Sequence, residues 1–233
     1  MKAAEVAEVY RRLADRTPEP KTELEYVNTY TLLVAVVLSA QATDASVNIA
    51  TRDLFKTVNT PQAMVELGEE RLRETIKTIG LFNTKAKNVI LLSKLLVEQF
   101  DGEVPADRDL LMALPGVGRK TANVVMNTAF GAETFAVDTH IFRVCNRTRL
   151  APGKNPLEVE LKLDKATPTP HRRDAHHLLI LHGRYVCKAR VPECWRCVIA
   201  DICRYRPKTP APGSEEEARL IASKRKKQRA RKH

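Results

Sequence analysis

The chain has 233 residues, enough for one domain or two modest ones with a hydrophobic core. Its 39 lysines and arginines outnumber 28 aspartates and glutamates, which gives a net charge of +11 and an isoelectric point of about 9.6. This charge favours a polyanionic partner, nucleic acid ahead of an anionic membrane surface. The first residues mix charges without an apolar signal core, and no apolar run approaches the ~20 residues of a membrane span. We therefore expect a soluble, intracellular protein.

Apolar residues recur at helical spacing along most of the chain, and no stretch shows the alternation typical of a strand. Residues 32–39 are apolar all round, which predicts a helix through the middle of a core. Capping residues, prolines and glycines mark the expected helix ends. The expected class is all-α, with helices over about 6–13, 32–39, 43–58, 61 onward, 69–78, 83–100, 107–114, 119–130, 138–148, 157–166 and 174–185.

Four of the five cysteines lie within 17 residues, at Cys187, Cys194, Cys197 and Cys203. In a reducing compartment such a group indicates metal binding rather than disulfides. Thiolates suit both zinc and iron–sulfur clusters, but the C-x6-C-x2-C-x5-C spacing has only one of the close pairs usual in zinc sites. The spacing favours an iron–sulfur cluster and leaves zinc open. Cys145 stands apart in an apolar stretch and is interpreted as a small buried hydrophobe.

A glycine-flanked turn, Gly116-Val117-Gly118, follows Leu114-Pro115 and joins two predicted helices. Glycine permits a tight turn and lets a phosphate approach the main chain, while the start of the second helix favours negative charge. This arrangement holds a DNA backbone without reading its sequence. An ordinary helix–helix turn is the alternative.

Lys120 lies in the first turn of the helix after this hairpin, where the helix dipole is expected to lower the pKa of its amine. A neutral lysine amine is the nucleophile that forms Schiff bases, although a lysine that only contacts phosphate would occupy the same place. Asp138 precedes another helix and is either its cap or a carboxylate that accepts the lysine proton.

These segments resemble the endonuclease III family of helix-hairpin-helix DNA glycosylases, over essentially residues 24–203. The resemblance is carried by residues 38–44, 114–127, 137–147 and 176–183 and by the cysteine spacing. It implies that Lys120 is the nucleophile, Asp138 the essential aspartate and the four cysteines the ligands of a [4Fe–4S] cluster. Residues expected to contact DNA are Gln41 and Leu81, which fill the gap left by a flipped base, and Gly116, Val117, Gly118, Arg119, Lys188 and Arg190.

The resemblance also implies a domain organisation. Residues 22–131 would form a six-helix bundle carrying the hairpin at about 107–130, and residues 1–21 with 132–209 a discontinuous cluster domain. Lys120 from one lobe would meet Asp138 from the other in the groove between them. Residues 210–233, of which 214–233 carry eight lysines or arginines against three glutamates, have no counterpart in the family and are expected to form a disordered basic tail.

The expected activity is base-excision repair on double-stranded DNA with damaged pyrimidines or abasic sites. The enzyme would flip the base, attack C1′ through Lys120 and cut the strand by β-elimination. A bacterial, cytoplasmic, nucleoid-associated monomer is expected. The alternatives are a monofunctional mismatch glycosylase, against which Lys120 counts, and a non-catalytic iron–sulfur protein that binds DNA, against which the presence of both Lys120 and Asp138 counts.

Overall fold

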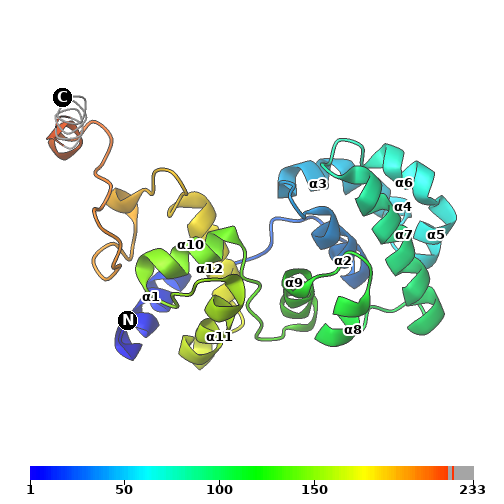
Figure 1. Ribbon diagram of the computed structural model, residues 1–233, viewed down its shortest axis with the longest axis horizontal. Coiled ribbons are helices and arrows are strands. Elements are labelled where there is room, and N and C mark those ends of the chain that lie inside the picture. The colour runs from blue at the N-terminus through cyan, green and yellow to red at the C-terminus, as the bar shows by residue number, and fades with distance from the viewer. Residues whose placement is uncertain (220–221, 223–233) are drawn as a thin grey trace. The chain divides into compact units, whose positions relative to one another are not determined.

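The computed structural model describes residues 1–219 and 222, and within that part every regular element is helical. The chain divides into two compact units (Figure 1). The first combines Met1–Pro20 with the chain from Val137 on, and the second is Lys21–Ala136. The all-α class expected from the sequence is confirmed.

The second unit is built around one fully buried helix, α2 (Thr29–Leu38), in which every residue from Tyr30 to Leu38 is buried. Asn28 caps it by accepting a hydrogen bond from the Thr31 N–H. The other helices of this unit are α3 (Asp44–Thr51), α4 (Leu54–Thr57), α5 (Pro61–Leu67), α6 (Glu69–Thr75), α7 (Phe82–Gln99), α8 (Arg108–Ala113) and α9 (Arg119–Phe130).

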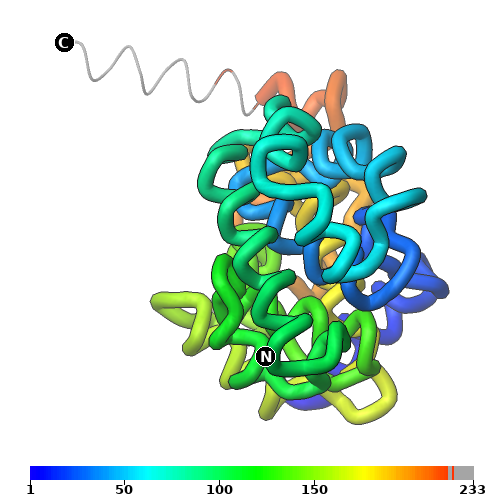
Figure 2. The backbone as a smooth tube through the Cα atoms, turned by 90° about the vertical axis from the view of Figure 1, so that its right-hand side faces the viewer, coloured from blue at the N-terminus to red at the C-terminus, as the bar shows by residue number. Residues whose placement is uncertain are grey.

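Helix α2 packs against α3, α7 and α9, and α7 runs beside α5 and α6, as Figure 2 shows for the cyan and green segments nearest the viewer. A helix that is apolar all round is stable only when neighbours cover all of its faces. The expected central helix is therefore present, and its neighbours provide the frame for the turns described below.

One expected helix is interrupted. Residues 43–58 were expected to form a single helix, but α3 ends at Thr51 and α4 begins at Leu54. The Thr51 hydroxyl donates to the carbonyl of Val47 at 2.9 Å, a contact that bends helices. Both pieces still bury one face, through Val47, Leu54 and Phe55.

The first unit packs α1 (Ala3–Arg16) and α10 (Thr139–Thr148) against α12 (Ala175–Tyr185), with α11 (Pro156–Ala166) beside α10. Two 3-10 turns, η1 (Thr169–His171) and η2 (Cys194–Arg196), complete it. Gly183 lets α10 and α12 approach closely, because a Cβ there would lie 2.9 Å from the Cβ of His140. Residues 215–219 are helical, and the Glu217 N–H donates to the Ser214 hydroxyl oxygen. The basic residues 223–233 of the expected tail lie outside the described residues.

Candidate functional site

The α8–α9 hairpin has two glycines with different roles. Gly116 has φ +78°, and a Cβ there would lie 3.0 Å from the Asn88 amide nitrogen. At Gly118, by contrast, a Cβ would meet no atom within 4 Å. The first glycine is therefore required by the fold, whereas the second leaves open space in front of the main chain.

Val117 anchors the hairpin from inside. Its side chain is buried, and its N–H donates to the carbonyl of Leu114 at 3.1 Å. Both groups help to hold the turn, and the contact of this residue with DNA stays a prediction. Helix α9 then begins without a side-chain cap at Gly118, with Arg119 half-buried and Lys120 exposed in its first turn.

Gln41 and Leu81 share an unusual backbone conformation. Both have a positive φ, 54° and 61°, although neither is glycine. Leu81 is 58% exposed, and a Cβ on the preceding Gly80 would lie 3.9 Å from the carbonyl oxygen of Gln41. An exposed leucine in the left-handed region costs about 1–2 kcal/mol, so surrounding structure must impose this turn.

Asp138 is the N-cap of α10. Its Oδ1 accepts hydrogen bonds from the N–H groups of His140 at 2.9 Å and Ile141 at 2.8 Å. Both bonds are made to one oxygen, which leaves Oδ2 outside the cap. The capping role and a chemical role were alternatives for this residue; the geometry lets a single carboxylate perform both. Lys120 lies in the second unit of the chain and Asp138 in the first.

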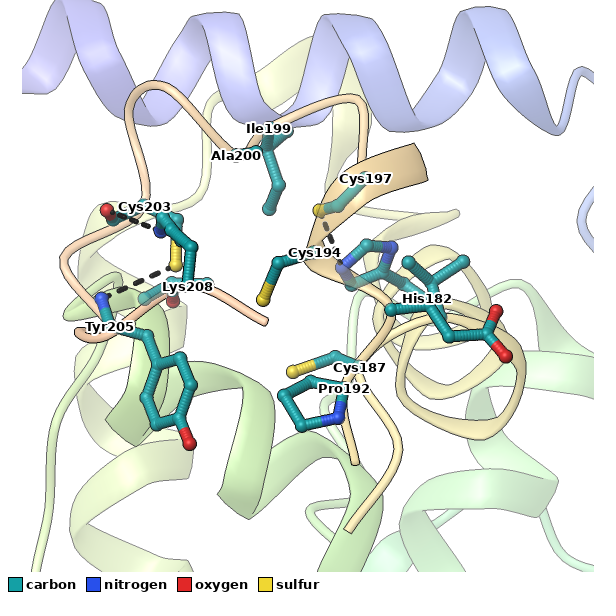
Figure 3. Close-up of a pocket in the computed structure, with 13 residues that line it drawn as sticks. His182, Cys187, Pro192, Cys194, Cys197, Ile199, Ala200, Cys203, Tyr205 and Lys208 are labelled. Carbon is teal, nitrogen blue, oxygen red and sulfur yellow. Dashed lines mark hydrogen bonds between the residues drawn. The ribbon is translucent and has the colours of Figure 1, made fainter. Parts of the chain in front are cut away.

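The four clustered cysteines line one cavity of about 330 Å³, part of it open to solvent. Apolar side chains, among them Val186, Pro192 and Ile199, line it together with polar ones that include His182 and Glu193. Figure 3 shows the sulfurs of Cys187, Cys194 and Cys203 directed into the space between them. Burial raises the pKa of Cys187, and that of Cys197 to about 11. Cys145, by contrast, is fully buried away from this cavity, as expected.

In the part of the chain that the structure describes, no three His, Cys, Asp or Glu side chains are grouped so as to hold a metal ion. The four sulfurs instead surround the cavity, as Figure 3 shows. His182 lies against Cys197, with Nε2 3.7 Å from Sγ. Burial, with Arg16 and Arg196 nearby, lowers the pKa of His182 to about 4, so the imidazole is neutral at pH 7.

Two arginines of α10 hold the start of the cysteine loop, and sequence reasoning did not single them out. Arg143 donates through Nε to the carbonyl of Cys187 at 2.9 Å. Arg147 donates to the carbonyls of Lys188 and Ala189, both at 2.6 Å, and lies 3.6 Å from the Cys187 sulfur. The only sequence signal was their spacing of four residues, which places both on one helix face.

Of the two basic loop residues expected to contact DNA, Lys188 forms an ion pair with Glu193 at 2.6 Å, while Arg190 is exposed. A phosphate would therefore compete with Glu193 for Lys188. Among the described residues, none of the helices has the length and apolar character needed to cross a membrane.

Comparison with known proteins identifies the family. The model of the HhH-GPD superfamily of base excision DNA repair proteins matches residues 34–169. Endonuclease III of Escherichia coli strain K12 is 58% identical over 208 residues, 89% of this chain and 99% of that protein. Endonuclease III of Rickettsia conorii is 55% identical over 205 residues, 88% of this chain and 98% of that protein.

The chain belongs to the endonuclease III family. It is therefore a DNA glycosylase and abasic-site lyase of base-excision repair, with damaged DNA as its partner. The family is known for an iron–sulfur cluster.

Solved structures agree with this assignment. A non-covalent endonuclease III–DNA complex superimposes with a TM-score of 0.83 at 43% identity, covering 88% of this chain and 96% of that one. A trapped endonuclease III–DNA covalent intermediate gives 0.82 at the same identity and coverage. A thermostable thymine-DNA glycosylase, 23% identical with a TM-score of 0.77, shares the fold.

Proposed function

We propose that this endonuclease III removes oxidised and otherwise damaged pyrimidines from duplex DNA and cuts the resulting abasic strand through a Schiff base on Lys120. The observation that carries the proposal is the position of Lys120. Its amine is exposed in the first turn of α9, next to Gly118, where the main chain faces open space. A phosphate held at this helix end would place the adjacent sugar near a nucleophile.

The chemistry can be written with these residues alone. Asp138 accepts the proton of the Lys120 ammonium, and the neutral amine attacks C1′ of the flipped nucleotide. The bond from C1′ to the base breaks, and the base leaves with the electron pair and is protonated. Opening of the sugar ring gives an iminium ion, whose C2′ proton is acidic. Loss of that proton expels the 3′ phosphate by β-elimination. The Asp138 oxygen outside the helix cap, Oδ2, is the proposed proton acceptor.

The DNA contacts follow the same proposal. Gly116, Gly118 and Arg119 would hold a phosphate at the hairpin, and Val117 would keep the turn in place. Gln41 and Leu81 would enter the gap left by the flipped base, which their exposed, left-handed turns support. Arg190, and Lys188 if released from Glu193, would contact the backbone farther along.

Borohydride trapping tests the nucleophile. Purified protein mixed with an abasic or oxidised-pyrimidine duplex and borohydride should form a covalent complex, because the reductant converts the iminium ion to a stable amine. Lys120→Ala should abolish the complex. Lys120→Arg, the matched control, keeps the positive charge for DNA binding and should also give no complex. Undiminished trapping in either variant would refute the assignment.

A panel of lesion-bearing duplexes tests the substrate class. Base release and strand cleavage, measured side by side, should both be fastest for oxidised pyrimidines. Base release without strand cleavage would instead indicate a monofunctional glycosylase, and binding without either product a non-catalytic protein.

We also propose that Cys187, Cys194, Cys197 and Cys203 hold a [4Fe–4S] cluster. Four thiol sulfurs around one largely apolar cavity fit the corners of such a cluster. When bound, the cluster would join four points of the loop and supply no electron to the reaction, since base loss and β-elimination need none. The purified protein should be brown with about four irons per chain. Cys197→Ala should lose iron while Cys145→Ala keeps it; a colourless, folded protein with one zinc would contradict the proposal.

For cellular location, the bacterial relatives support action on cytoplasmic DNA. We propose a monomer associated with the nucleoid, which gel filtration and co-sedimentation with nucleoids would test.

A further inference from the structure

Lys85, near the start of α7, has a buried side chain. The residue is 5% exposed, and its Nζ has no hydrogen-bond partner among the described residues. Burial lowers the pKa of this amine. Lysine is almost never buried unless it is paired, because removing an ammonium from water is costly. A bound anion would offset this cost.

Lys85 lies one helical turn after Leu81. The Lys85 N–H donates to the carbonyl of Leu81 at 3.1 Å. Because side chains in a helix lean toward its N-terminus, we expect the Lys85 side chain to extend toward the Leu81 turn.

The start of α7 has no negative charge in its own first turn. The helix has 18 residues, no side-chain cap at Leu81 and no acidic residue in its first turn. The helix dipole adds partial positive charge at the same end. An uncapped helix start and a buried ammonium one turn along the same helix both favour an anion.

Two turns proposed to contact DNA flank this helix end. Leu81 is itself the N-cap of α7, and a Cβ on Gly80 would lie 3.9 Å from the carbonyl oxygen of Gln41. Asn88 lies one turn along α7 from Lys85. A Cβ added to Gly116 of the hairpin would lie 3.1 Å from the Cβ of Asn88, so the two segments are close together. The start of α7 is therefore next to both the Leu81 turn and the hairpin.

We propose that the start of α7 is a second phosphate site, in which the Lys85 ammonium pairs with a backbone phosphate of the DNA strand that Leu81 enters. Because the amine is buried, the start of α7 must open for a phosphate to reach it. The phosphate would then supply a counter-charge to the ammonium. This inference rests on the proposed role of Leu81 and is distinct from phosphate binding at the Gly116–Gly118 hairpin.

The alternative is that Lys85 only fills space, its methylene groups packing in the core. The two possibilities differ in how DNA binding depends on salt. Each phosphate contact by a lysine steepens the fall of log affinity with log salt by about 0.9 on duplex DNA. A lysine that only fills space contributes nothing to that slope.

The test uses the full-length, cluster-containing protein and a duplex carrying a tetrahydrofuran abasic-site analogue, which cannot be cleaved. Lys85→Met removes the charge and keeps the length of the side chain. Its salt slope should fall by about 0.9, and its Kd should weaken roughly tenfold, as expected for one charged hydrogen bond. Lys85→Arg should keep the slope. Lys87→Met, an exposed lysine on the opposite side of the same helix, should behave as wild type.

Thermal melting of the free proteins provides a second measurement. Lys85→Met should melt at the same or a higher temperature than wild type, because it removes a buried charge without a partner. If this variant does not fold, Lys85→Gln replaces it in the salt titration. A slope equal to that of wild type in the uncharged variant would overturn the phosphate site. Borohydride trapping of the wild-type protein, run in parallel, shows separately whether the proposed chemistry stands.

Discussion

Substitution of Asp138 separates its capping role from its proposed chemical role. Its Oδ1 accepts two N–H groups at 2.9 and 2.8 Å, and asparagine caps helices about as well as aspartate. Asp138→Asn therefore keeps the cap and loses only the interaction of the charge with the helix dipole, about 0.3–1 kcal/mol. Asp138→Ala loses the cap, which costs typically about 1 kcal/mol and up to about 2.

These values translate into melting temperatures. For a chain of this size, 1 kcal/mol shifts the melting temperature by about 2–4 °C. We expect Asp138→Ala to melt a few degrees below wild type and Asp138→Asn to melt closer to it. Both should release the base more slowly by about 10²–10⁴-fold in single-turnover assays at saturating enzyme, because neither has a carboxylate to accept the Lys120 proton.

Asp107 provides the matched control. It caps α8 through the same oxygen, Oδ1, which accepts the N–H groups of Asp109 at 2.8 Å and Leu110 at 2.9 Å. Asp107→Ala should therefore lower the melting temperature as much as Asp138→Ala while base release stays near the wild-type rate. If Asp138→Asn releases the base within threefold of wild type, the carboxylate is not the proton acceptor and Asp138 is only a cap.

Three further predictions concern the hairpin, the Leu81 turn and the tail. Gly116→Ala should lose about 1–2 kcal/mol of stability, because its φ is +78° and its Cβ would meet Asn88. Gly118→Ala should keep its stability and bind DNA more weakly. Thermal melting measures the stability of both variants, and filter binding measures their affinity for DNA. Leu81→Gly should relieve about 1 kcal/mol of backbone strain and therefore melt at a higher temperature than wild type. It should also release the base more slowly. Equal rates of base release in the variant and wild type would contradict the proposal that Leu81 fills the gap left by the flipped base. Residues 214–233 include basic residues outside the described part of the chain. Their deletion should flatten the dependence of log affinity on log salt for undamaged duplex, without changing single-turnover base release. An unchanged slope would show that the tail does not contribute to DNA binding.

Local sequence rules located the helix ends and the hairpin well. Asp107 and Asp138 each precede a helix and cap it, and Gly131 ends α9 in the left-handed conformation, because capping depends on a few neighbouring residues. The spacing of the four cysteines likewise predicted that they act together, and all four line one cavity. Features set by short segments of chain could be predicted from the sequence.

Prediction was less complete where function depends on contacts between distant segments. Val117 was expected to contact DNA, but core packing buries its side chain. Arg143 and Arg147 reach the cysteine loop from a helix about forty positions earlier in the chain. No local pattern encodes such contacts, because they form only when the helices pack.

The sequence by itself determined the helical class, the capped helix ends, the hairpin and the grouping of cysteines, since each follows from backbone preferences or ligand chemistry within a few residues. Only the tertiary structure decided that Leu81 and Gln41 take left-handed conformations on neighbouring turns, and that the Lys85 amine is buried without a hydrogen-bond partner among the described residues. The physical reason is that strain and desolvation are imposed on a residue by distant parts of the chain, which fold around it and cannot be read from its neighbours in sequence.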